Sequence, residues 1–392
     1  MAIAHVLYRS RATVPPTAPF LHALLDGART RNEAEDLTGV LVVDGRRFVQ
    51  WIEGPRPALE RVWRSIRRDP RHRDIESLTV TWDGGRLFPD WRMQLATGEA
   101  MAELTQTVWL DPVQRREVHA GAQAAEDCIY ALALRRRLPP LGRLLECLTA
   151  DDELPWLEAT EQVAVWTPSL RAAALALFGP LSRALAAAWM RDRLTAQDIV
   201  IAQARLRQLL RQVAGHAHAG GPVDRRVLVA TAPGEADVFG VAFAATAMDL
   251  HGWDVQCLFP RTVDELLRVL RRTAFDALHL ASSECFRRED RLADIAATVR
   301  AAHRASCHPR MLVLLGGRAF VEQPGLAVLL GADGEGLDQG TRADELPSMV
   351  EHVRRLGRSP AAMIAQATIA DVALKVHGRV YGIPERHTAD GR

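Results

Sequence analysis

Phe48-Val49-Gln50-Trp51-Ile52-Glu53-Gly54 combines the alternation of a β-strand with a single amide side chain in an apolar run. Successive side chains of a strand point to opposite faces, so Val49 and Trp51 share one face while Phe48, Gln50 and Ile52 share the other. A glutamine on a buried face needs polar partners. The stretch therefore predicts a strand that carries a polar binding group among apolar neighbours.

Short apolar runs alternate with amphipathic stretches on both sides of this strand, in the order β-α-β-β-α-β. That order is ferredoxin-like and belongs to the α+β class. The turn Asp44-Gly45 predicts a hairpin at its centre. The expected elements are strands at Ile3 to Tyr8, Gly39 to Val43, Arg47 to Ile52, Glu76 to Trp82 and Trp91 to Ala96, and helices at Pro19 to Asn32 and Arg56 to Arg68.

The remaining chain divides into a helical part and a second α/β part. Residues 101–215 carry Ala, Leu and Arg at helical spacing, interrupted by prolines such as Pro180, which predicts a linker and cap bundle with helices at 170–177, 181–189 and 199–210. After a glycine-rich linker, residues 222–355 alternate buried strands with helices, which predicts a doubly wound parallel sheet. We assign residues 1–100 to the first domain and 356–392 to a C-terminal extension.

Composition excludes several classes of protein. The 392 residues are 48% hydrophobic and 25% charged, which is typical of a folded chain of two or three domains rather than a disordered one. The net charge of +1 gives no global attraction to nucleic acid. The scattered cysteines predict no thiolate metal site, and we expect no apolar run long enough to cross a bilayer. We expect a cytoplasmic protein without a metal centre or membrane partner.

Five motifs of the first domain resemble the BLUF family of flavin-binding blue-light sensors. They occur in family order and with family-like spacing across about 95 residues, and they are Tyr8-Arg9-Ser10, Asn32 with Leu37-Thr38-Gly39, the stretch 48–54, Asp69-Pro70-Arg71-His72, and Arg86-x-Phe88-x-x-Trp91-x-Met93. Independently of the family, a flavin needs an apolar slot and amide-type donors and acceptors, which Asn32 and Gln50 offer.

The resemblance implies an FAD site and a photocycle. Tyr8 is expected to donate an electron and a proton, and the Gln50 amide to rearrange its hydrogen bonds. Either Trp91 or Met93 is expected to line the flavin, and the sequence leaves the choice open. The implied cofactor-binding residues are Tyr8, Ser10, Arg31, Asn32, Phe48, Gln50, Ile66, Arg71, His72, Trp91 and Met93.

The last domain resembles cobalamin-binding domains in the loop after its first strand. Glu235 and Gly240 match that family's acidic and glycine positions, but Asp237 stands where the family has its axial histidine. A carboxylate is a poor substitute for imidazole on cobalt or haem iron. The sequence therefore leaves open whether this domain binds haem, cobalamin or nothing. The ligand candidates are Glu235, Asp237, Gly240, Ser282, Ser283, Gly316 and Gly317.

The combination of domains resembles the AppA type of photosynthesis-gene antirepressor, although the cysteine-rich tail of that type is missing. The resemblance implies a photoreceptor that is not an enzyme and that contacts a DNA-binding transcriptional repressor or another regulator protein, without touching nucleic acid itself. A homodimer is compatible with it. The alternative is a haem or cobalamin sensor in which the flavin domain is auxiliary.

Overall fold

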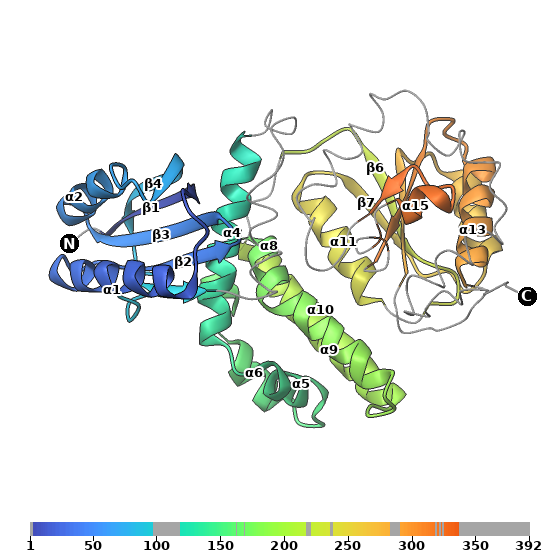
Figure 1. Cartoon of the computed structure of the whole chain (residues 1–392). Helices are drawn as coiled ribbons and strands as arrows, with labels where there is room; N and C mark the ends of the chain where they lie inside the picture. The colour runs from blue at the N-terminus through green and yellow to red at the C-terminus, as the bar shows by residue number, and fades with distance from the viewer. Residues whose placement is uncertain are drawn as a thin grey trace, which may run out of the picture. The chain divides into compact units, whose positions relative to one another are not determined.

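The computed structural model describes residues 3–96, 118–161, 163–167, 169–216, 221–235, 238–282, 291–317, 320, 323 and 325–336. The chain divides into two compact units, Met1–Arg137 and Leu138–Arg392, which are described separately (Figure 1). The predicted domain borders near residues 100 and 356 lie outside the described residues.

The first unit is a five-stranded sheet with the strand order β4-β1-β3-β2-β5. β1, β3, β2 and β4 pair antiparallel and β5 joins β2 in parallel, so the predicted ferredoxin-like fold is confirmed. The elements are β1 (Ile3–Ala12), α1 (Ala18–Ala34), β2 (Thr38–Asp44), β3 (Arg47–Pro55), α2 (Arg56–Ile66), β4 (His72–Gly84), β5 (Gln94–Ala96) and α4 (Val118–Arg137).

Different helices cover the two faces of this sheet. On one face Val6, Tyr8 and Ile52 pack against α1 and α2, and α2 contributes apolar side chains at helical spacing, including Leu59 and Val62. On the other face His5 and Trp51 lie beside α4: the Trp51 and Tyr130 rings are 6.3 Å apart. The sequence placed residues 118–137 in the middle bundle, whereas the structure groups α4 with the first unit.

The second unit begins with helices. They are α5 (Leu141–Thr149), α6 (Leu154–Thr160), α7 (Val163–Trp166), α8 (Leu170–Ala173), the π-helical η2 (Ala174–Phe178), α9 (Gly179–Trp189) and α10 (Ala196–His216). The break expected at Pro180 does not occur, because the chain stays helical from Leu170 to Trp189. The π-helical turn directly before Pro180 accommodates a residue that lacks the N–H of a regular helix.

The stretch Leu170–Trp189 corrects the expectation that no apolar run is long enough for a membrane span. It has 20 residues, and its most apolar 18-residue window has a mean hydropathy of 1.3, so by length and composition it could cross a membrane. In the structure 56% of its most apolar window is buried inside the protein, as in a core helix. It is the single such stretch among the described residues.

The second unit ends in a parallel five-stranded sheet with the order β10-β9-β8-β6-β7. The predicted doubly wound α/β fold is therefore confirmed, and Figure 1 shows α11 and α13 on opposite sides of the sheet. The order reverses between β6 and β8, where such sheets bind ligands beyond their carboxyl ends. The elements are β6 (Arg226–Thr231), α11 (Phe239–Leu250), β7 (Asp254–Leu258), α12 (Val263–Arg272), β8 (Ala277–Ala281), α13 (Arg291–Ala305), β9 (Leu312–Gly316), α15 (Leu326–Leu329) and β10 (Gly334–Glu335).

Candidate functional site

A cleft of the first unit opens between α1, α2 and the sheet face that these helices cover. It encloses about 480 Å³ of space not filled by protein atoms, its mouth included. Its walls combine apolar side chains with a small number of polar ones, which is typical of a small-molecule site. The lining residues are Tyr8, Leu24, Leu25, Ala28, Arg31, Leu41, Phe48, Gln50, Ile66, Asp69, Arg71, His72 and Met93.

The Gln50 amide lies at the centre of the polar contacts in this cleft. Tyr8 and Gln50 are opposite each other in the β1–β3 register, so both side chains point to the same face of the sheet. The Tyr8 hydroxyl donates a hydrogen bond to Gln50 Oε1. Gln50 Nε2 donates to Met93 Sδ at 3.4 Å, and a thioether is a weak acceptor. The amide is thus held firmly on its oxygen side and weakly on its nitrogen side.

The Tyr8 phenol is kept protonated by its surroundings. Burial raises its pKa well above the usual range, and the charge of Asp69 raises it further, while the Arg31 cation acts in the opposite direction. Burial disfavours the phenolate because a charge is poorly solvated away from water. Tyr8 therefore enters any reaction in this cleft as a neutral hydrogen-bond donor.

His72 is fixed by hydrogen bonds at both ring nitrogens. Its Nε2 lies 3.0 Å from the Ile66 carbonyl oxygen, which can only accept, so Nε2 carries the proton. Its Nδ1 lies 2.9 Å from Ser10 Oγ, within hydrogen-bond distance. Arg71 pairs with Asp69, and this hydrogen bond lowers the pKa of the carboxyl group. The cleft thus has an oriented imidazole and a paired cation at one end.

Buried polar atoms beside the cleft match the needs of a flavin. Asn32 lies one helical turn after Ala28 on α1; its Nδ2 donates to the Arg92 carbonyl at 2.5 Å, while its buried Oδ1 has no partner in the described part of the chain. Arg31 Nε is buried without a partner there as well. The pyrimidine edge of a flavin carries both N–H and C=O groups, so these atoms and the apolar walls fit that cofactor.

Most of the flavin contacts predicted from the sequence line the cleft, with three exceptions. Ser10 and Asn32 are buried beside the cleft but are not part of its lining. Trp91 is elsewhere: its ring stacks on Phe88 at 4.9 Å, and the Arg136 guanidinium lies 4.8 Å from it. The structure thus places Met93, and not Trp91, against Gln50.

Sequence reasoning missed a further set of wall residues. Leu24, Leu25 and Ala28 recur at three- and four-residue spacing on α1, and this periodicity marks the helix face that points to the sheet. Leu41 on β2 and Asp69 after α2 complete the lining. Helical spacing could have identified the α1 residues, whereas no local signal distinguishes Leu41 from other buried strand residues.

In the described part of the second unit, the candidate residues form no comparable site. Glu235 is buried and forms an ion pair with Arg291, so its carboxylate is already paired with a cation from the same chain. Gly240 lies in the first turn of α11. At Gly317, with φ +121°, a side chain would meet the Ser282 carbonyl oxygen at 2.1 Å, while Ser282 N donates to the Gly316 oxygen. Asp237 and Ser283 lie outside the described residues.

The described candidates give no support for an axially ligated tetrapyrrole, because the Glu235 carboxylate is already paired with Arg291. The small residues Gly316 and Gly317 are explained by the close approach of two backbone segments.

Comparison with known proteins identifies the family of the first unit. Residues 3–94 match the family model BLUF, described as sensors of blue light using FAD, so the chain has a BLUF domain at its N-terminus. The photoactivated adenylate cyclase subunit beta of Euglena gracilis is 35% identical over 96 residues, which are 24% of this chain and 11% of that protein. The blue light- and temperature-regulated antirepressor BluF of Escherichia coli (strain K12) is 31% identical over 90 residues, 23% of this chain and 22% of that protein.

Both matches cover only a small part of the relatives' own length. Among solved structures, a cobalamin-binding protein from Desulfitobacterium hafniense DCB-2 is 15% identical with a TM-score of 0.27, covering 56% of this chain and 98% of that one. The fold of the second unit rests on its own strand order.

Proposed function

We propose that this chain is a cytoplasmic blue-light receptor that binds FAD in the cleft and regulates gene expression through light-dependent contact with a regulator protein. The observation that carries this proposal is the Gln50 amide, held between the Tyr8 hydroxyl and Met93 Sδ in a cleft with flavin-compatible walls. The BLUF match over residues 3–94 supports it.

The physical basis of the switch is the two-fold character of an amide side chain. The terminal torsion of glutamine has two broad wells, and turning it exchanges Oε1 and Nε2. In the structure only the Oε1 side makes a strong hydrogen bond, because Nε2 faces a thioether. The turned amide loses little on the Met93 side, and on the Tyr8 side Nε2 would donate to the hydroxyl oxygen in place of Oε1 accepting from it. Gln50 therefore has two hydrogen-bonded arrangements, as a switch requires.

The loss of an electron and a proton from Tyr8 triggers the turn of the amide. When bound, the flavin supplies the absorption of blue light and an acceptor for one electron. A phenol that has lost an electron is a strong acid, so its proton moves along the existing hydrogen bond to Gln50 Oε1. Return of the electron and the proton after the amide has turned leaves the same atoms in a different hydrogen-bond pattern.

The segment that contains Met93 connects this pattern to the rest of the unit. The Met93 carbonyl accepts from Arg29 Nε at 3.1 Å, and the Trp91 carbonyl accepts from Gly39 N at 2.7 Å. Arg136 of α4 pairs with Asp90 at 3.0 Å and lies over the Trp91 ring. A change at Gln50 thus reaches α4 through residues 90–93.

We propose that the output is a protein contact and not an enzymatic step. The named function of the Escherichia coli relative, an antirepressor, supports a DNA-binding repressor or a similar regulator as the partner. The match to the cyclase subunit beta covers only 11% of that protein, so it brings no cyclase function to this chain. Direct nucleic-acid binding is not part of the proposal, and a homodimer remains compatible with it. Sensing by haem or cobalamin, the alternative from the sequence, is not favoured by the ion pair of Glu235.

The experiment is an absorption spectrum of the purified chain in the dark and directly after blue light. We expect a flavin spectrum that shifts slightly to the red and recovers in darkness. Gln50→Leu should keep the flavin and lose the reversible shift, because leucine has no polar atoms to exchange. Gln256→Leu, the same change at an exposed position of β7, is the matched control and should behave like the parent. A persistent shift in Gln50→Leu, or a chain without affinity for flavin, would contradict the proposal.

A further inference from the structure

The segment 87–93 connects the two faces of the first sheet. The backbone N–H groups of its first two residues donate to the Glu53 carboxylate at 2.8 and 2.7 Å. At its end Met93 Sδ accepts from Gln50 Nε2 at 3.4 Å, and β5 follows directly at the sheet edge beside β2. The segment thus has one end at a buried carboxylate and the other at the amide of the cleft.

Glu53 and Gln50 lie on opposite faces of β3. They are three residues apart on one strand, so their side chains point to opposite sides of the sheet. Gln50 lines the cleft. Glu53 is opposite His5 in the β1–β3 register, and the His5 ring stacks on Trp51 on the face that α4 covers. A rearrangement at Gln50 can therefore reach the α4 face through the segment 87–93.

The Glu53 carboxylate holds the start of the segment firmly. It is fully buried, and besides the two backbone N–H groups it accepts from Thr38 Oγ1 at 3.1 Å and from Trp51 Nε1 at 2.9 Å. Hydrogen bonds to an ionised acceptor are stronger than those between neutral groups. The Leu87 carbonyl in turn accepts from Arg137 Nη2 of α4 at 3.2 Å. The start of the segment is therefore fixed between β3 and α4, whereas its end rests on a thioether contact.

We propose that Glu53 is a positioning residue of the light response, which anchors the segment 87–93 and so keeps Met93 against Gln50. This inference rests on the proposed function. The turned amide directs Oε1 to the Met93 sulfur, and neither atom has a proton to donate, so this contact favours the dark arrangement slightly. An anchored segment keeps Met93 in this contact and speeds the return of the amide. A loosened anchor lets Met93 move away and prolongs the light state.

The test is the rate at which the flavin red shift of the full-length chain decays in darkness after a pulse of blue light. Glu53→Gln places an NH₂ group opposite N–H donors, so it loosens the anchor and should slow recovery about three-fold or more with the flavin still bound. Thr38→Val removes one of the four donors to the carboxylate and should slow recovery less.

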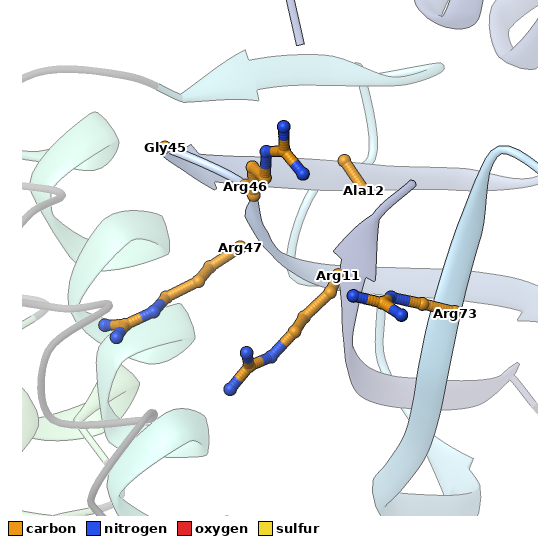
Figure 2. A pocket seen from close by; sticks show the side chains of 6 residues that line it. All are labelled: Arg11, Ala12, Gly45, Arg46, Arg47 and Arg73. Atoms are coloured by element: carbon orange, nitrogen blue, oxygen red, sulfur yellow. The ribbon is translucent and has the colours of Figure 1, made fainter. Parts of the chain in front are cut away.

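Two control variants separate anchoring from a general loss of stability and from a change at the surface. Leu7→Val shortens a fully buried side chain of β1, a strand that β3 and β2 separate from β5, so it destabilises the unit away from the segment. Arg46→Ala changes an exposed side chain at the tip of the β2–β3 hairpin, which Figure 2 shows directed away from Arg11 and Arg47. Both variants should recover at the parental rate.

An infrared signature distinguishes a positioning role of Glu53 from a purely structural one. If the segment pulls on its anchor when Gln50 turns, the light-minus-dark spectrum contains a carboxylate band that Glu53→Gln removes and Leu7→Val keeps. A parental recovery rate in Glu53→Gln, equal slowing in Leu7→Val, or the absence of a Glu53-dependent band would each overturn the inference and leave the proposed function standing. A parent chain without any reversible red shift would overturn both.

Discussion

At the scale of single residues, β3 carries two buried polar side chains, Gln50 and Glu53, that differ in their roles. Gln50 faces the cleft, on the side of the strand that sequence alternation predicts. Glu53 faces the other way, and the sequence suggests only a role in shaping the next turn. In the structure Glu53 is fully buried and accepts from Thr38 Oγ1, Trp51 Nε1, and the backbone N–H groups of Leu87 and Phe88. Two of these donors come from more than 30 residues away, so no local pattern could predict them.

Glu53→Gln should lower the free energy of unfolding of the first unit by about 1–3 kcal/mol, because one carboxylate oxygen becomes an NH₂ group that faces N–H donors. Urea unfolding followed by tryptophan fluorescence measures the change. Glu60→Gln on the exposed face of α2 is the control and should cost less than about 1 kcal/mol. Equal stabilities of the two variants would show that the Glu53 contacts contribute nothing.

The choice between Trp91 and Met93 shows another limit of sequence reasoning at this scale. Both side chains are apolar and lie two residues apart, so alternation treats them alike. The structure separates them through Phe88, which stacks on Trp91, and Arg136, which lies 45 residues further along the chain. The orientation thus depends on tertiary contacts.

At the scale of elements, the strands and helices follow closely from sequence periodicity. β3 and α2 lie within a few residues of the predicted ranges, because alternation and helical spacing are local properties. The position of α4 on the open sheet face is not local, since residues 97–117 separate it from β5. Its docking buries His5, whose ring stacks on Trp51 at 4.0 Å and whose Nε2 lies 3.9 Å from Glu126.

The buried His5 should make the first unit acid-sensitive. Burial lowers its pKa from 6.5 to about 4, so between these values the unfolded chain binds a proton that the folded chain does not. Stability is therefore unaffected above pH 7 and falls as the pH drops from about 6.5 towards 4, by about 2 kcal/mol at pH 5. Burial also raises the pKa of neighbouring Glu126, and Thr79 opposes this with a hydrogen bond.

His5→Phe should keep the stack on Trp51 and remove this part of the acid sensitivity. The measurement is the difference in unfolding free energy between pH 7.5 and pH 5 for the parent and the variant. His22→Phe changes an exposed histidine of α1 and should retain the parental difference. An unchanged pH dependence in His5→Phe would refute the assignment to His5.

At the scale of the whole molecule, the sequence predicts both fold classes and their order along the chain. It does not predict that α4 belongs with the sensor sheet, nor that Glu235 is paired with Arg291, 56 residues away. Both facts depend on contacts between distant segments. The compact first unit, which contains the cleft, includes α4 and ends at Arg137.

Truncated fragments of the chain test whether α4 is part of the first unit. A fragment of residues 1–137 should bind flavin and show the full reversible red shift, because it keeps both covers of the sheet. A fragment of residues 1–105 loses α4 and exposes His5 and Trp51, so it should unfold at a lower urea concentration. Both fragments should lose regulation of the partner. Equal unfolding midpoints would show that α4 does not stabilise the sheet.

The most direct test of the central claim is a light-minus-dark infrared difference spectrum of the full chain with isotope-labelled glutamine side chains. Rearrangement of the Gln50 amide predicts a glutamine carbonyl band that shifts with the label, decays with dark recovery, and disappears in Gln50→Leu but not in Gln256→Leu. A reversible flavin shift without any label-sensitive glutamine band would show that light leaves the Gln50 amide unchanged and would contradict the mechanism.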